Sequence, residues 1–215
     1  MWNAAGPLTI GRSKFDGRPG DFWPGAVDDV RVFDRALSAK EVAALANRRQ
    51  GRWTLDEGAG TAAADSSGNG RVAVRAGGTS WSVGRFGGGM TFDGSSGHLA
   101  TSGPVVNTST TFTVSAWVRF FTALADAPPV VGEWAQLTGV YDADASRIQL
   151  WVNGVPTGSA AVPGHWTAIG PLTIGRARYH GNPTDFWPGD IDEVRAYSGV
   201  LNGPEIQALS ANPPG

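Results

Sequence analysis

Two segments of the chain are near copies of each other. Residues 6–33 read GPLTIGRSKFDGRPGDFWPGAVDDVRVF, and residues 170–197 read GPLTIGRARYHGNPTDFWPGDIDEVRAY, at a constant offset of 164 positions and without a gap. From Trp2, aligned with Trp166, to Leu45, aligned with Leu209, 23 of the 44 residue pairs are identical. The second copy follows a long segment that begins at Gly51, whereas the first copy stands at the start of the chain. The sequence therefore predicts an unequal repeat, in which the end of one domain precedes a more complete one.

Short apolar segments between glycines and prolines predict β structure throughout the chain. The sequence has 31 Gly and 14 Pro, which separate segments rich in Val, Thr, Trp and Phe, a pattern typical of many strands joined by tight turns. In FTVSAWVRF, from Phe112 to Phe120, every second residue is apolar, which predicts a strand with one packed apolar face. Asn153 and Gly154 both tolerate positive φ, so they predict a two-residue hairpin. We expect an all-β sandwich.

A short helix is predicted at the end of each copy. Ser38 is followed by Glu41, and Asn202 is followed by Glu205. This spacing is that of a capping box, in which the two side chains accept hydrogen bonds from the free amides of the first turn. The following segments, AKEVAALAN and PEIQALSAN, each carry one apolar stripe.

The charge and the residue usage exclude several classes of function. The formal net charge is −2 with 17% charged residues, which leaves no basic stripe for nucleic acid. No apolar run approaches the roughly 18 residues that cross a bilayer, so we expect no membrane insertion. The chain has no Cys, which excludes disulfides and thiolate sites. The start, MWNAAGPLTIG, resembles no export signal, so we expect any signal peptide to lie outside this chain.

Several motifs occur in the order seen in one family of jelly-roll domains. They are WTLDEGAGTAAADSSGNG, GRFGGGMTFDGSSGHLA, FTVSAWVRF, GEWAQLTGVYDADASRIQLWVNGV and the segment from GPLTIGR to PEIQAL. In this order the chain resembles bacterial LamG-like, or concanavalin A-like, jelly-roll domains. The resemblance implies an all-β jelly-roll sandwich with a short C-terminal helix. It also implies two parts, with residues 1–48 as the C-terminal portion of a preceding repeat and residues 51–212 as a LamG-like domain.

The second repeat is shorter than the family pattern. Between Phe120 and Glu133 stand only the residues FTALADAPPVVG, where such domains usually place several more strands. We expect residues 2–47 to fill the resulting gap on the same sandwich, or else to dock into a second chain and so form a homodimer by segment exchange.

The residues do not support a hydrolase. Laminarinase-type enzymes of this fold carry a Glu-x-Asp-x-x-Glu or Glu-x-Asp-x-Glu strand, and the nearest segment here is GDIDEVR. Asp190 and Asp192 alternate onto one face, but Val194 stands where the second catalytic Glu belongs. Since a retaining glycosidase needs two carboxyl groups about 5 to 5.5 Å apart, we expect no enzyme activity.

The resemblance implies a structural calcium ion. Jelly-roll modules often bind one between the first strand, its following loop and the last strand, and Glu57, Asp65 and Asp192 are the candidate ligands because Ca²⁺ prefers oxygen. The alternative is that Asp65 caps a turn through its own backbone and that Asp192 pairs with an Arg such as Arg195.

The loop RARYHGNPTDFWPG is the candidate recognition site. The loop combines flat aromatic faces with hydrogen-bonding groups, which suits sugar rings or a protein surface. The residues are Tyr179, His180, Asn182, Asp185 and Trp187. Two alternatives remain: Phe186 plugs the end of the sandwich, and Trp187 packs in the core or between repeats.

These observations favour a non-catalytic binding or adhesion module that is secreted and recognises carbohydrate or a partner protein. The alternative is a purely structural repeat or spacer in a larger secreted protein or assembly. Exposure of Tyr179 and Trp187 would favour recognition, and burial of both would favour the spacer.

Overall fold

The alternating apolar segments form strands, and the chain divides into two compact units, Met1–Lys40 and Glu41–Gly215. The structure is a computed structural model that describes residues 7–25, 27, 30–38, 42, 49–122, 130–162, 164 and 166–211. The predicted helix of the first copy lies outside the described residues apart from Val42. The prediction of an all-β sandwich with a short C-terminal helix is confirmed.

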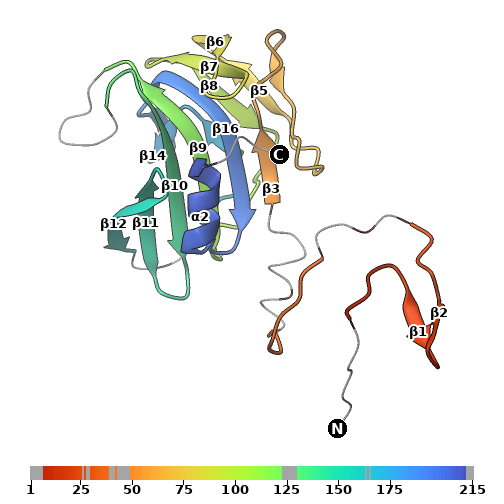
Figure 1. Cartoon of the computed structure of the whole chain (residues 1–215). Helices are drawn as coiled ribbons and strands as arrows, with labels where there is room; N and C mark the ends of the chain where they lie inside the picture. The colour runs from red at the N-terminus through yellow and green to blue at the C-terminus, as the bar shows by residue number, and fades with distance from the viewer. Residues whose placement is uncertain are drawn as a thin grey trace. The chain divides into compact units, whose positions relative to one another are not determined.

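The larger sheet of the second unit has eight strands among the described residues (Figure 1). Their order is β12-β11-β10-β9-β16-β7-β6, and β3 also pairs with β16. The bounds are β3 Arg49–Trp53, β6 Thr79–Val83, β7 Gly88–Asp93, β9 Phe112–Phe120, β10 Trp134–Asp142, β11 Arg147–Val152, β12 Val155–Ala161 and β16 Pro188–Ser198. Strand β16 is central because it pairs with β9 along its length, with β7 through its first half and with β3 through its second half.

The predicted Asn153-Gly154 hairpin is confirmed. Val152 pairs with Val155 across the turn, and the φ angles of Asn153 and Gly154 are 50° and 76°. Both angles belong to the left-handed region that a type I′ turn requires. The turn therefore fixes the register of β11 against β12.

A smaller sheet packs against part of the larger one. It contains β13 Thr173–Ile174, β8 His98–Thr101, β5 Ala73–Ala76 and β4 Ala62–Ala63, in that order. The core between the sheets is built from large apolar side chains of both, including Trp53, Met90, Phe92, Leu99 and Ile191. The Trp53 ring is fully buried, and its indole N–H donates to the backbone oxygen of Arg71 at 2.9 Å.

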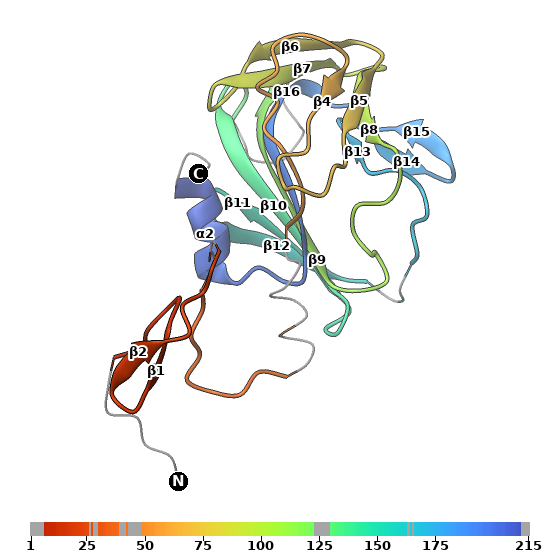
Figure 2. The same cartoon turned by 90° about the vertical axis from the view of Figure 1, so that its right-hand side faces the viewer.

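Helix α2, Gly203–Ala211, covers the opposite face of the larger sheet (Figure 2). Ile206 packs there with Val140, Tyr197 and Leu201 in a second apolar cluster. The predicted capping box is present. The Asn202 amide donates to Glu205 at 2.7 Å, and the Glu205 amide donates to the Asn202 side chain at 3.0 Å.

Strand β9 differs from its prediction in one respect. The polar side chains of Thr113 and Ser115 are buried, whereas the apolar residues Phe112, Val114 and Ala116 are only half-buried. The Thr113 hydroxyl donates a hydrogen bond to the backbone oxygen of Gly199 at 2.8 Å. The apolar face of this half of β9 is thus the less protected one.

The two copies of the repeated segment form the same hairpin. In the first unit, β1 Ser13–Phe15 pairs with β2 Arg18–Gly20; in the second, β14 Ala177–Tyr179 pairs with β15 Asn182–Thr184. The registers correspond, and in both copies the Trp amide after the hairpin donates to a glycine oxygen at 2.8 Å. Local interactions therefore determine this hairpin.

Candidate functional site

Two residues of the predicted recognition loop lie together at the tip of the β14–β15 hairpin. The rings of Tyr179 and His180 meet edge to face, with centroids 4.2 Å apart. Tyr179 is 70% exposed. His180 is also exposed and adopts a positive φ of 47° at the turn. The hairpin thus presents an aromatic and an imidazole ring to solvent.

The other two predicted recognition residues have different surroundings. Asp185 is exposed after β15, with a φ of 50°. Trp187 packs against the core, and its ring centroid lies 4.0 Å from that of Phe120. Its indole N–H finds no acceptor among the described residues. Trp187 therefore packs in the core, as the alternative for this residue predicted, and Phe186 beside it is also half-buried.

The predicted calcium ligands in the first loop accept hydrogen bonds from the backbone. Asp65 accepts from the amides of Ser67 at 2.9 Å, Arg52 at 3.0 Å and Arg71 at 2.9 Å. Burial raises the pKa of Asp65, but these hydrogen bonds outweigh it and leave the pKa below its usual value. Glu57 accepts from the Ala64 amide at 2.7 Å. The turn-capping alternative for Asp65 matches this geometry.

The third predicted ligand, Asp192, is fully buried in β16. Its Oδ2 accepts from the Phe86 amide at 2.9 Å, while Oδ1 finds no donor among the described residues. Burial raises the pKa of this carboxyl to about 7, the charge of Glu193 adds to the increase, and the Phe86 hydrogen bond opposes it. The expected ion pair with Arg195 is not formed, because Arg195 bonds Glu193 at 3.2 Å instead.

That difference has a structural cause. The register of β16 against β9 shifts between Asp192 and Arg195, and Glu193 takes a φ of 48°. The bulge turns the Glu193 carboxylate toward both Arg195 and Arg52, which lies 3.3 Å away. No group of three or more His, Asp or Glu side chains in the described part of the chain is arranged to hold a metal ion.

The third carboxylate of β16, that of Asp190, also has hydrogen-bond partners. Asp190 is buried, accepts the Thr91 hydroxyl and forms an ion pair with Arg119, whose Nε donates at 2.8 Å. Two buried carboxyl groups, one ion-paired and one facing a loop amide, are not placed to attack a glycosidic bond.

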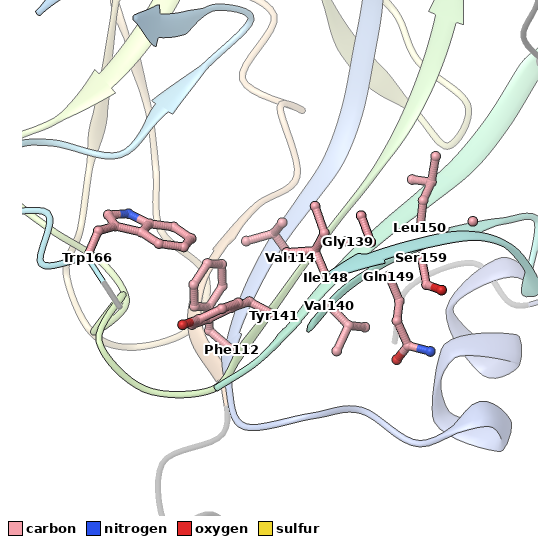
Figure 3. A pocket seen from close by; sticks show the side chains of 12 residues that line it. Phe112, Val114, Gly139, Val140, Tyr141, Ile148, Gln149, Leu150, Ser159 and Trp166 are labelled. Atoms are coloured by element: carbon pink, nitrogen blue, oxygen red, sulfur yellow. The ribbon is translucent and has the colours of Figure 1, made fainter. Parts of the chain in front are cut away.

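A groove that the sequence did not predict lies on the larger sheet (Figure 3). It has a volume of about 480 Å³ and lies over β9, β10, β11 and β12. Trp166, Tyr141 and Phe112 form one end, with the Trp166 ring centroid 5.0 Å from that of Tyr141 and 6.3 Å from that of Phe112. The rest of the lining is mainly aliphatic, including Val114, Ile148 and Leu150. The only signal in the sequence was the short segment between β9 and β10.

Several solved structures have a similar fold. Domain 4 of AbnA, a GH43 extracellular arabinanase from Geobacillus stearothermophilus solved with arabinotriose, aligns with a TM-score of 0.62 at 17% identity, over 76% of this chain and 98% of that one. The binding domain of Paraclostridial Mosquitocidal Protein 1 gives 0.59 at 12% identity. The botulinum neurotoxin serotype D binding domain gives 0.56 at 10% identity. This chain spans about half of each toxin domain, covering 52% and 51% of them.

Two further comparisons concern membranes and sequence relatives. No helix in the described ranges is long and apolar enough to cross a bilayer. No curated protein matches the sequence. A family model of the concanavalin A-like lectin/glucanases superfamily, of laminin G type, matches residues 1–43 and 119–207, more than half of the chain. Together with the jelly-roll neighbours, this match shows that the chain belongs to the laminin G-like family of the concanavalin A-like superfamily.

Proposed function

We propose that this chain is a non-catalytic, secreted binding module that recognises carbohydrate or a partner protein surface through the β14–β15 hairpin. The observation that carries the proposal is the exposed ring pair of Tyr179 and His180 at the hairpin tip. An aromatic face stacks on the apolar face of a sugar ring, while the phenol and imidazole exchange hydrogen bonds with hydroxyl groups. Asp185 supplies a carboxylate after the same hairpin.

The fold supports a binding role. The arabinanase domain was solved with arabinotriose, and the other two structures of similar fold are binding domains. At identities of 17% and below, these structures support the jelly-roll scaffold, and the ligand of this chain has to be argued from its own residues.

The surroundings of the acidic residues support a non-catalytic role. Catalytic carboxylates must reach the substrate, but Asp190 is ion-paired to Arg119 and buried, and Asp192 is buried beneath the Phe86 loop. Neither faces a cleft with a second free carboxylate among the described residues.

A glycan array that includes arabino-oligosaccharides tests the proposal. Tyr179→Ala should weaken binding by about 1 to 3 kcal/mol, the contribution of a stacked ring, and should leave the melting temperature unchanged because the ring is exposed. Tyr179→Phe should retain most of the affinity, since it keeps the ring. Val83→Ala, at another exposed apolar position, controls for nonspecific effects. Binding that Tyr179→Ala does not weaken, or a chain that binds neither glycans nor a protein in surface plasmon resonance, would show the proposal to be wrong.

We also propose calcium as a structural ion at Asp192. The unpartnered Oδ1 favours this, because a buried carboxylate oxygen without a donor is suited to a cation. Glu57 and Asp65 are both engaged by backbone amides, so further ligands would have to be backbone oxygens or water.

The test is a thermal melt in millimolar calcium and in EDTA. Calcium at 100 times its dissociation constant should add about 2.7 kcal/mol of stability, and Asp192→Asn should remove the gain. Identical melting curves in calcium and EDTA would exclude a structural ion.

A second candidate function is a structural repeat. The exposed apolar side chains of the first unit, which include Leu8, Ile10, Trp23 and Val32, favour it, because such surfaces are usually covered in an assembly.

A further inference from the structure

The inner face of β9–β12, on the side of the smaller sheet, is apolar and open. The strand register aligns Phe112, Tyr141, Ile148 and Ala160 in one row across the four strands. The next row is Val114, Gly139, Leu150 and Gly158. These two rows form the floor of the groove (Figure 3). Ile148 and Leu150 remain 42% and 45% exposed.

The opposite face of the sheet is covered at β10 and β16, which makes the open face unusual. Helix α2 packs on that side against Val140 and Tyr197. In a sandwich, the inner face of each sheet should be less exposed to solvent than its outer face, because a second sheet packs over the inner face. Here the smaller sheet ends at β13, so no strand among the described residues of the second unit covers the two apolar rows. The groove is therefore the place where this sandwich lacks cover.

The first unit has the complementary property. Ile10 is 59% exposed, but its counterpart in the second copy, Ile174, is 6% exposed. Val32 is 72% exposed, and its counterpart Ala196 is fully buried. In the second copy, these counterparts lie in the core between the sheets. The described residues of 7–38, which we call the donor segment, thus include apolar side chains that are exposed although their counterparts lie in a sandwich interior.

We propose that the donor segment of one chain covers the β9–β12 groove of a second copy of the same chain. Each chain thus carries an exposed apolar segment in its first unit and an open apolar groove in its second unit. The counterparts of the donor segment in the second copy pack in the core that this sheet shares with the smaller one. Val194 and Ala196 lie in one cluster with Val114, Ala116 and Leu137 of β9 and β10.

Each chain carries one donor segment and one groove. Reciprocal exchange between two chains uses both and leaves no unsatisfied copy of either, so the assembly closes as a two-fold dimer. The groove is almost wholly apolar, which suits a segment rich in Val and Ile better than a sugar.

Sedimentation equilibrium of the full chain over a range of concentrations tests the proposal. The wild-type chain should be a dimer. Val32→Asp in the donor segment and Leu150→Asp in the groove should each weaken dimerisation by at least about tenfold, because each places an unpaired charge in an apolar contact. Val32 is exposed in the first unit and Leu150 is exposed in the second, so circular dichroism should show the fold unchanged. Val83→Asp on β6, an exposed valine outside the groove, is the matched control and should dimerise as the wild type does.

Mixing the two variants separates exchange from other modes of association. A mixed dimer of Val32→Asp and Leu150→Asp contains one intact donor segment facing one intact groove, whereas either variant alone contains no intact pair. The mixture should therefore associate more strongly than either variant by itself.

Three results would overturn the proposal. The first is a wild-type chain that is monomeric at every concentration. The second is a dimer that neither substitution weakens. The third is a dimer that Leu150→Asp weakens and mixing does not restore, because this pattern would mean that two grooves pair with each other or that a different partner occupies them.

Discussion

At the scale of single residues, Asp192 sets the clearest physical constraint. Its pKa is raised by burial from 3.8 to about 7. At a pH between 3.8 and about 7, Asp192 keeps its proton in the folded chain but has lost it in the unfolded chain. The folded state is therefore favoured at low pH, and this contribution is lost as the pH rises from about 4 through 7, at about 1.4 kcal/mol for each unit.

Asp192→Asn should remove this dependence. The amide keeps an oxygen for the Phe86 N–H and has no charge to bury. In urea denaturation with EDTA present, the variant should be more stable than the wild type at pH 8 and similar to it at pH 4. Asp56→Asn, which replaces an exposed carboxylate that accepts from the nearby Gly88 amide, controls for the loss of one negative charge. An unchanged difference between the two pH values in Asp192→Asn would contradict the assignment.

The same residue shows what a sequence can and cannot reveal. The cap made by Asp65 was a readable alternative, because one of its donors, the Ser67 amide, lies two positions away. The hydrogen-bond partner of Asp192 is Phe86, 106 positions away. Arg195 forms its ion pair with Glu193 because of the bulge in β16, and this bulge depends on the pairing of β16 with β9. Contacts made across a sheet follow from register, which local pattern does not determine.

At the scale of elements, the local sequence determined the conformation of each segment but not which other elements pack over it. The two copies of the hairpin have the same register and the same positive φ at Asp16 and His180, because turn chemistry acts within a few residues. The alternation in β9 correctly predicted a strand. It could not predict that Thr113 would be buried and Val114 half-exposed, since this depends on which elements lie over each face.

At the scale of the whole molecule, the two units differ in what they bury. Both apolar clusters of the second unit lie between Trp53 and Leu209, so that unit contains its own core. The described large apolar side chains of the first unit are exposed instead, apart from the half-buried Leu37. A segment of this kind is stable only when it packs against another apolar surface, because the burial of apolar side chains must offset the conformational entropy that the chain loses on ordering.

Deletion of residues 1–48 should therefore leave a folded but altered protein. The remaining chain keeps both clusters, so its far-ultraviolet circular dichroism and its cooperative unfolding should be retained. The melting temperature of the full chain should rise by about 1–3 °C for each tenfold increase in concentration, since dimerisation stabilises the folded state by mass action. The deleted chain should show no such rise, because each groove has lost its partner. A deleted chain that unfolds, or one that keeps the concentration dependence, would mean that residues 1–48 act within their own sandwich or take no part in association.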